Sequence, residues 1–208
     1  MKTGNKIYLK KPRLYSYKTI SVWVVPTVFT PFLTFSTKIL LEFIEDLPIK
    51  NKRFLELGCG CGVISILAAK KGAVVTATDI NQIALDALEK NAVKNGVVLD
   101  IISSDLFQNL NGKIFDYIII NPPYYPKNPA SIAENAWFCG ENFDYFEGLF
   151  SQLPKFTNEN TVVAMILSED CAIENIKAIA LKNGMAFELL LEKKVFAERN
   201  FIFSIKRL

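Results

Sequence analysis

The sequence predicts an α/β fold with a doubly wound, mostly parallel sheet, and three observations lead to this prediction. Short runs of apolar and β-branched residues alternate with segments whose apolar residues recur every three to four positions. Three glycines directly follow the first of these runs, as in strand–turn–helix units that approach a ligand closely. The 208 residues are half apolar and 22% charged, which suits one globular α/β domain with a full core.

The amino-terminal part of the chain is strongly basic. Residues 1–18 contain six of the 24 Lys and Arg residues and no acid, which leaves 18 bases and 21 acids in the rest of the chain. We expect a basic arm over residues 1–21 and a single domain over residues 22–208. The arm is either solvated or contacts phosphate or an acidic partner. Residues 19–35 form an extended segment rich in aromatic side chains.

The first elements of the domain follow from capping and turn signals. Ser36 is expected to cap a helix that Pro48 ends. The elements expected next are a strand at 53–57, a helix from Val63 to Gly72, a strand at 74–78, a helix at 81–95, and strands at 97–103 and 117–120.

The second half of the chain begins with a loop at 125–141, which contains Trp137 and Phe138. We interpret it as a lid or substrate wall because it follows the end of a central strand. The elements expected after this loop are helices at 142–153 and 170–182, and strands at 161–167, 185–191 and 199–206. The last two strands are expected to form an antiparallel hairpin because only a short turn separates them.

The glycines of residues 58–62 stand between a strand and a helix. A Cβ there would block the approach of a ligand to the helix amino terminus, or it would disfavour the positive φ that the turn requires. Asp79 ends the next strand, 21 positions after Gly58, which is close to the spacing at which a carboxylate meets ribose hydroxyls. After the third strand, Asp105 can accept from an adenine amino group while Leu106 packs against the ring.

The strand at 117–120 leads directly into Asn121-Pro122-Pro123-Tyr124. The prolines hold Asn121 rigidly at the carboxyl end of a central strand, the edge where open α/β sheets bind ligands. The Asn121 side-chain oxygen and the Pro122 carbonyl can accept both hydrogens of a planar NH2 group, and Tyr124 offers a flat face for stacking. Holding both hydrogens favours rotation of the nitrogen lone pair toward an electrophilic methyl group. The alternative is a tight turn after a strand, since Asn and Pro are common in turns.

Composition excludes several classes of chemistry. The chain has no histidine, so mechanisms that need a histidine base are excluded, whereas methyl transfer to nitrogen needs none. The four cysteines show no framework spacing, which favours a reduced cytoplasmic setting. Cys59-x-Cys61 is a possible metal pair, but no second pair follows and we expect no metal. Pro26 and Pro31 interrupt the apolar amino-terminal segment, so we expect neither a membrane span nor a signal peptide.

The segments 55–62, Ser104-Asp105 and 121–124, together with Asp79, resemble the class I S-adenosylmethionine-dependent methyltransferases. More narrowly, they resemble the small methyltransferase family, which includes release-factor glutamine methyltransferases and RNA-base amino methyltransferases. The resemblance covers roughly residues 22–208 and implies a Rossmann-like seven-stranded sheet with S-adenosylmethionine as the cofactor. The residues implied to hold the target NH2 group are Asn121, Pro122, Pro123 and Tyr124. The implied cofactor contacts are Thr37, Glu56, Gly58, Cys59, Gly60, Gly62, Asp79, Ile80, Asn81, Ser104, Asp105, Leu106 and Asn121.

The sequence departs from the family pattern in two places. Ser36 stands where the family has an acid before Thr37. We expect no separate helical amino-terminal domain like that of bacterial release-factor enzymes, so a release-factor glutamine is not assumed as the substrate. A protein Gln or Asn amide and the amino group of an RNA base both remain open. The basic arm favours RNA or a ribosome-associated protein.

Two other functions remain open. One alternative is a non-catalytic binding or scaffold subunit. A small partner subunit, in that case or beside catalysis, is expected to contact residues 19–35. The other alternative is a nicotinamide-dependent oxidoreductase. Its Gly-x-Gly-x-x-Gly fingerprint is not matched, because Gly62 falls one residue early.

Overall fold

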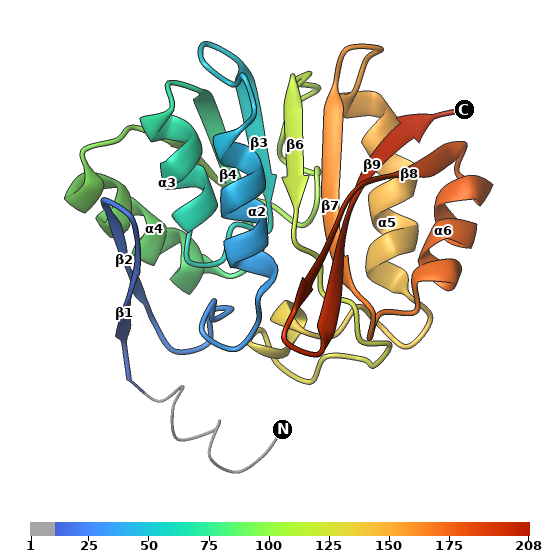
Figure 1. The fold of residues 1–208 in the computed structure, drawn as a ribbon, viewed down its shortest axis with the longest axis horizontal. Helices are drawn as coiled ribbons and strands as arrows, with labels where there is room; N and C mark the ends of the chain where they lie inside the picture. Colours follow the sequence, from blue (N-terminus) through green and yellow to red (C-terminus); the bar gives the residue numbers. More distant parts are fainter. Residues whose placement is uncertain (1–10) are drawn as a thin grey trace.

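The computed structural model describes residues 11–208, in which seven strands form one sheet between two layers of helices (Figure 1). The strand order is β5-β4-β3-β6-β7-β9-β8, with β9 antiparallel to both of its neighbours. The other strand pairs of the sheet are parallel. The prediction of a doubly wound, seven-stranded α/β sheet with an antiparallel carboxy-terminal pair is therefore confirmed.

The bounds of the elements agree with the predicted order. The strands of the sheet are β3 (Arg53–Leu57), β4 (Val74–Asp79), β5 (Asp100–Ser103), β6 (Tyr117–Ile120), β7 (Val162–Ser168), β8 (Met185–Val195) and β9 (Glu198–Arg207). The helices are α2 (Ser36–Glu45), α3 (Val63–Lys70), α4 (Gln82–Asn95), α5 (Asp144–Gln152) and α6 (Ile173–Lys182), with short 3-10 helices η1 (Glu134–Ala136) and η2 (Leu153–Phe156). None of the helices in the described part of the chain is long and apolar enough to cross a membrane.

The core has two halves, one on each face of the sheet. Helices α2, α3 and α4 pack on one face, and α5 and α6 pack on the other (Figure 1). Side chains of β6 alternate between the halves, with Ile119 on the α2 side and Ile118 and Ile120 on the α5 side. All four residues of β6 are buried, which explains why this strand is a continuous apolar run.

Residues 13–24 form a hairpin that the sequence did not predict. Strand β1 (Arg13–Tyr17) pairs with β2 (Ile20–Val24), so the hairpin spans the expected boundary between arm and domain at residue 21. Asn91 of α4 hydrogen-bonds both the N–H and the carbonyl of Trp23, and Asn95 does the same for Ser21. The two amides thus replace a neighbouring strand along the outer edge of β2. Residues 1–10 of the predicted arm lie outside the described residues.

The start of α2 corrects a prediction. Phe35, not Ser36, stands before the first residue of the helix, and no side chain caps it. The Ser36 hydroxyl is instead 3.0 Å from the Thr34 hydroxyl and accepts a hydrogen bond from Asn121. Because Ser36 is bonded toward β6, it is unavailable to the orphan N–H groups of the helix.

Candidate active site

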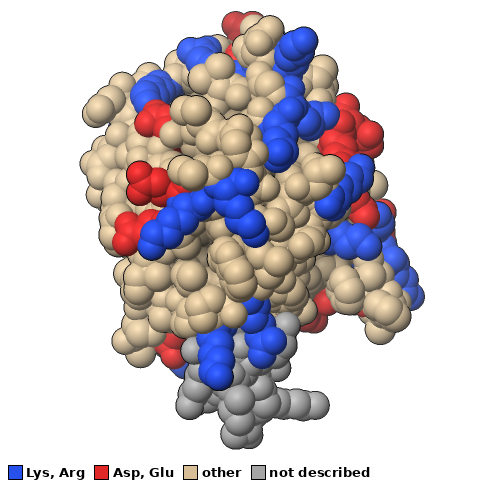
Figure 2. Space-filling model, turned by 90° about the vertical axis from the view of Figure 1, so that its left-hand side faces the viewer, with Lys and Arg blue, Asp and Glu red and all other residues tan. Residues whose placement is uncertain are grey.

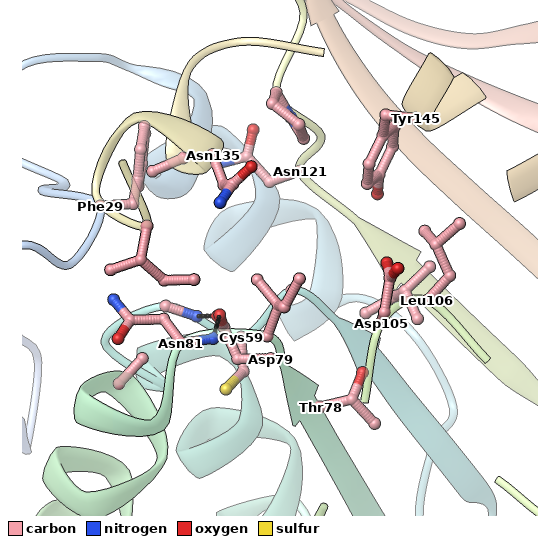
Figure 3. Close-up of a pocket in the computed structure, with 18 of the residues that line it drawn as sticks. Phe29, Cys59, Thr78, Asp79, Asn81, Asp105, Leu106, Asn121, Asn135 and Tyr145 are labelled. Atoms are coloured by element: carbon pink, nitrogen blue, oxygen red, sulfur yellow. Dashed lines mark hydrogen bonds between the residues drawn. The ribbon is translucent and has the colours of Figure 1, made fainter. Parts of the chain in front are cut away.

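Residues at the carboxyl ends of the parallel strands line a cavity of about 610 Å³. These strand ends form the lower edge of the sheet in Figure 1. One side of the cavity is formed by the glycine turn after β3, the end of β4 and the end of β5, and the other by Asn121 and the loop that follows β6 (Figure 3). Most of its lining residues lie in the segments 27–29, 56–64, 78–81, 104–108, 121–123 and 128–152.

The glycine turn is fixed by the end of β4. Gly58 and Cys59 donate their backbone N–H groups to the carbonyl of Thr78, at 2.9 and 2.7 Å. The Asp79 carboxylate accepts from the backbone N–H of Gly60 at 2.8 Å and from that of Asn81 at 2.9 Å. Burial raises the pKa of the Asp79 carboxyl, and these N–H groups oppose that rise. Asp79 therefore joins the turn after β3 to the start of α4.

Gly62 does not line the cavity and serves packing instead. Its φ of +74° is in the left-handed region, and a Cβ there would lie 2.1 Å from the Cδ1 of Leu88 in α4. A side chain at this position would push α3 and α4 apart. The structure thus gives Gly62 a role in the close packing of two helices, and the cofactor contact that the resemblance implied for it stays a prediction.

Glu56, in β3, is buried beneath the turn. Its carboxylate accepts hydrogen bonds from the Ser65 backbone N–H, at 2.8 Å, and from the Ser65 hydroxyl. Ser65 lies in the first turn of α3, where a negative charge is stabilised by the helix dipole. Burial nevertheless raises the pKa of the Glu56 carboxyl to about 8, with the Ser65 bonds acting in the opposite direction. Glu56 also lines the cavity, so its charge state reaches a bound ligand.

Asn81 ties the segment after β2 to the site. Its Oδ1 accepts from the Ile83 N–H and caps α4, while its Nδ2 donates to the Thr27 carbonyl at 3.1 Å. Phe29 follows on this segment, and its ring lies 5.1 Å from that of Trp137 in the loop after β6. Two segments more than 100 residues apart in the sequence thus meet at the cavity.

Asn121 ends β6 and faces the cavity. Its Nδ2 donates to the Ser36 Oγ at 3.3 Å, and Ser36 is almost fully buried. No donor among the described residues reaches the Asn121 Oδ1. Asn135 of η1 also points into the cavity, and no described residue bonds its side-chain amide (Figure 3). One acceptor oxygen of Asn121 is therefore available to a ligand.

The rest of the predicted Asn-Pro-Pro-Tyr site is not uniformly exposed to the cavity. Pro123 lines it, whereas Pro122 is buried behind it. Tyr124 does not line the cavity, because its ring packs into the core on the α5 side, 4.7 Å from the ring of Tyr125. Burial raises the pKa of the Tyr124 hydroxyl. The aromatic side chains that do line the cavity are those of Phe29, Phe138 and Tyr145.

Most of the predicted cofactor contacts line the cavity, and several of its other lining residues were not predicted. The predicted residues that line it are Thr37, Glu56, Gly58, Cys59, Gly60, Asp79, Ile80, Asn81, Ser104, Asp105, Leu106 and Asn121. Phe29, Asn135 and Tyr145 were not predicted individually. The aromatic segment 19–35 and the loop 125–141 were the only signals for the first two, and Tyr145 lies in a helix whose face the pattern did not assign.

The lining of the cavity is acidic. It contains Glu56, Asp79, Asp105 and Asp144, and no Lys or Arg from the described residues. Tyr145 lies close enough to Asp79 and Asp105 for their charges to raise the pKa of its hydroxyl, although burial is the larger cause. Its side chain points toward Asp105 (Figure 3). A cationic or neutral ligand suits this lining better than an anionic one.

The methyltransferase small domain family model matches residues 20–137. A putative protein N5-glutamine methyltransferase of Methanocaldococcus jannaschii is 35% identical over 154 residues, which covers 69% of this chain and 77% of that protein. The ribosomal RNA small subunit methyltransferase C of Haemophilus influenzae is 37% identical over 119 residues, which covers 54% of this chain but only 35% of that protein.

Two solved structures have the same fold. A 16S rRNA N2 G1207 methyltransferase of T. thermophilus, in complex with AdoMet and guanosine, has a TM-score of 0.67 at 19% identity over 93% of this chain and 50% of that chain. An E. cuniculi complex responsible for the methylation of the translation termination factor eRF1 has a TM-score of 0.65 at 20% identity, over 88% of this chain and 99% of that chain.

The chemistry of the cavity lining suits S-adenosylmethionine. The sulfonium and amino groups of this cofactor are cationic, and the lining offers the carboxyl groups of Asp79, Asp105 and Asp144 beside Glu56, whose pKa burial raises to about 8. The turn beside Asp79 has the glycines that let a ligand approach closely. The match of the family model and the identity to the M. jannaschii protein agree with this site. The chain belongs to the methyltransferase small domain family and is an S-adenosylmethionine-dependent methyltransferase.

Proposed function

We propose that the enzyme methylates the nitrogen of a planar NH2 group, either the amide of a protein Gln or Asn side chain or the amino group of an RNA base. The observation that carries this proposal is the hydrogen bonding of the Asn121 side-chain amide. Its Nδ2 is bonded to Ser36, at 3.3 Å, while its Oδ1 has no donor among the described residues and faces the cavity. An oxygen so placed accepts one N–H of an incoming NH2 group.

We propose that the Pro122 carbonyl supplies the second acceptor, although Pro122 is buried and does not itself line the cavity. No described residue donates to this carbonyl, and the proline ring fixes the direction in which the chain leaves β6. With both hydrogens held, the lone pair of the acceptor nitrogen turns out of the plane of the NH2 group. These residues thus act by orientation, which can contribute roughly 7–11 kcal/mol toward lowering a reaction barrier. Pro123 closes the cavity beside Asn121.

The cofactor supplies the methyl group on a positively charged sulfur. With the cofactor bound, the acceptor nitrogen would take the methyl group from sulfur, sulfur would keep the electron pair of the broken S–C bond, and one N–H proton would pass to water. We propose that Asp79 accepts the ribose hydroxyls and that the glycine turn holds the backbone of the cofactor. Asp105 accepts from the adenine amino group, with Leu106 against the ring. The other lining residues predicted as contacts, among them Thr37, Ile80 and Ser104, complete this half of the cavity.

The names of the relatives support both kinds of acceptor. The M. jannaschii protein is named for a protein glutamine, and the H. influenzae protein for ribosomal RNA. To test nitrogen methylation, purified enzyme and labelled cofactor are incubated with a lysate of cells that lack the gene. Mass spectrometry of the labelled product should locate the methyl group on a former NH2 nitrogen. A methyl group on carbon, oxygen or sulfur would refute the proposal.

We also propose that a small partner subunit can contact residues 19–35, because the Trp23 and Phe32 side chains are exposed there. The E. cuniculi relative is a complex with a second protein. Light scattering of the purified chain checks this. A chain that aggregates alone and becomes monodisperse with a partner supports it, and a stable, fully active monomer contradicts it.

A further inference from the structure

We propose that helix α5 forms a wall of the cofactor site: Gly148 leaves the space that the Leu106 side chain occupies, and the Tyr145 hydroxyl contacts the adenosine part of the cofactor. This inference rests on the cofactor placement in the proposed function, with Asp79 at the ribose and Asp105 at the adenine. It does not depend on which acceptor is methylated. The sequence resemblance implied no contact from this helix.

Helix α5 presents two different faces. Its core face consists of the buried Phe146, Leu149 and Phe150. Tyr145 and Gly148 are three positions apart and so lie together on another face, and both line the cavity. The helix therefore contributes to the core and to the cavity at the same time.

Gly148 lies where a side chain would disturb the site. Glycine inside a helix is less favourable than alanine, so a packing reason for it is expected. A Cβ built on Gly148 would lie 2.9 Å from the Cδ1 of Leu106, closer than such carbon atoms pack. Leu106 lines the cavity just after β5. An alanine at position 148 would therefore displace the Leu106 side chain from its place against the cavity.

The backbone of Leu106 is held in an unusual conformation. Its φ of +49° lies in the left-handed region, which a leucine seldom adopts. The Ser104 hydroxyl donates to the Leu106 carbonyl at 2.9 Å and accepts from the Asn109 N–H at 3.1 Å. Backbone conformations of this kind are concentrated at ligand sites. Ser104 thus fixes the backbone of Leu106, and Gly148 leaves room for its side chain.

Tyr145 places a hydroxyl beside the two carboxylates of the cofactor half. Burial raises the pKa of this hydroxyl, and the charges of Asp79 and Asp105 raise it further. The side chain points toward Asp105 (Figure 3), and its ring makes an edge-on contact with the ring of Phe146 at 5.3 Å between centroids. No described residue forms a hydrogen bond with the hydroxyl. A hydroxyl both donates and accepts, so it complements a ligand held by two groups that only accept.

The charges of the outer surface do not compete with these two carboxylates. On the face that carries α4 and the hairpin, Lys and Arg side chains are interspersed with acids and uncharged surface (Figure 2). The fields of interspersed exposed charges largely cancel, and salt screens them beyond about 10 Å. The carboxylates nearest the Tyr145 hydroxyl therefore dominate its surroundings, and a ligand that bonds this hydroxyl reaches them as well.

The first experiment tests Gly148 through a double-mutant cycle. Gly148→Ala and Leu106→Ala are made singly and together, and calorimetry measures the dissociation constant of S-adenosylhomocysteine, the product form of the cofactor. We expect Gly148→Ala alone to raise this constant on the order of tenfold. Beside Leu106→Ala it should have little further effect, because the side chain that it displaces is then absent.

Urea unfolding without cofactor separates this effect from a loss of folding. Gly148→Ala should be as stable as the wild type or more stable, because alanine favours the helix and the Leu106 side chain can move into the empty cavity. Unchanged affinity, additive losses in the double variant, or a parallel loss of stability and affinity would each overturn the role of Gly148.

The second experiment uses Tyr145→Phe, which removes the hydroxyl alone. The dissociation constants of S-adenosylhomocysteine and of 5′-methylthioadenosine, which lacks the amino-acid part, should both rise by roughly 2- to 10-fold, the factor that one hydrogen bond contributes. Tyr117→Phe is the matched control, because Tyr117 is a buried tyrosine at the other end of β6 from Asn121 and does not line the cavity. Unchanged affinity for both ligands, or a loss with S-adenosylhomocysteine alone, would overturn the contact with adenosine.

The outcomes also separate this inference from the proposed function. If Asp79→Ala weakens cofactor binding while both α5 variants bind normally, the inference fails and the cofactor placement stands. If Asp79→Ala also leaves the affinity unchanged, the placement itself is refuted and the inference falls with it.

Discussion

The Nδ2 of Asn121, at the end of β6, donates a hydrogen bond of 3.3 Å to the Oγ of Ser36, the first residue of α2 and 85 positions earlier in the chain. Ser36 is in turn 3.0 Å from the Thr34 hydroxyl. An Asn side chain has a donor end and an acceptor end, so a bond at one end decides what the other end presents. Ser36 therefore determines that Asn121 presents an acceptor to the cavity.

Ser36→Ala removes this restraint and should lower the rate of methyl transfer. Loss of orientation at a reacting group can cost up to roughly 100-fold in rate, while the cofactor half of the cavity is untouched. Single-turnover rates and calorimetric titration of the cofactor measure the two effects separately.

Ser36→Asp provides the control for the Ser36 prediction. A carboxylate only accepts, so it must bind the NH2 end of Asn121 and should restore much of the rate. A merely structural role for Ser36 would be indicated if Asp and Ala variants lost equal activity, or if cofactor affinity fell together with the rate.

Asp79→Ala should weaken cofactor binding. The carboxylate accepts from Gly60 and Asn81, and hydrogen bonds to charged groups contribute about 1.5–3 kcal/mol each. We expect the dissociation constant to rise by roughly 10- to 100-fold in calorimetry. Asp86→Ala is the matched control, because Asp86 is exposed on α4 and accepts from Gln82. Unchanged cofactor affinity in the Asp79 variant would refute its assignment to the ribose.

Gly62→Ala should destabilise the fold more than Gly58→Ala does. Both residues have positive φ, which costs a non-glycine residue about 1–2 kcal/mol. Only Gly62 would also drive a Cβ into Leu88, and overpacking of a core costs roughly a further 1–3 kcal/mol. Urea unfolding of the two variants measures the difference. Equal losses of stability would show that α3 and α4 separate without cost.

The pH dependence of stability should reveal Glu56. Burial holds the pKa of this carboxyl at about 8 in the folded state, above its ordinary value of 4.5. The folded state therefore binds the proton more tightly than the unfolded chain. Its stabilising contribution is complete below pH about 4.5 and is lost as the pH rises through about 8.

Glu56→Gln measures this contribution. Its amide oxygen can still accept from Ser65, but it cannot ionise. Both proteins are measured without cofactor, and the free energy of unfolding of the variant is subtracted from that of the wild type. This difference should fall by on the order of a few kcal/mol as the pH rises from about 4.5 to about 8. A constant difference over this range would contradict the raised pKa.

The parts of the fold that local pattern specifies were predictable. The buried run of β6, the glycine turn and the Asn95-Gly96 helix end each depend on residues adjacent in sequence, and the structure has all three. Strand β5 begins at Asp100 rather than at residue 97 as predicted, because residues 97–99 connect the end of α4 to the strand. Such bounds depend on where a neighbouring strand offers partners.

The parts that long-range contacts decide were not predictable. The β1–β2 hairpin is held by Asn91 and Asn95, which lie 68 and 74 positions away from the residues they bond. No local pattern marks these two asparagines as partners of the hairpin. Ser36 has the composition of an N-cap, but its partner is Asn121. Tyr124 has the position of a stacking residue, yet its partly buried ring packs against the core on the α5 side.

Replacing Asn121 by Ala tests the central claim most directly, through the single-turnover rate of methyl transfer and the cofactor dissociation constant measured on the same preparation. If this amide holds the acceptor nitrogen toward the methyl donor, transfer should be lost while the cofactor still binds with near wild-type affinity. Transfer at the wild-type rate, or a parallel loss of cofactor binding and transfer, would contradict the account.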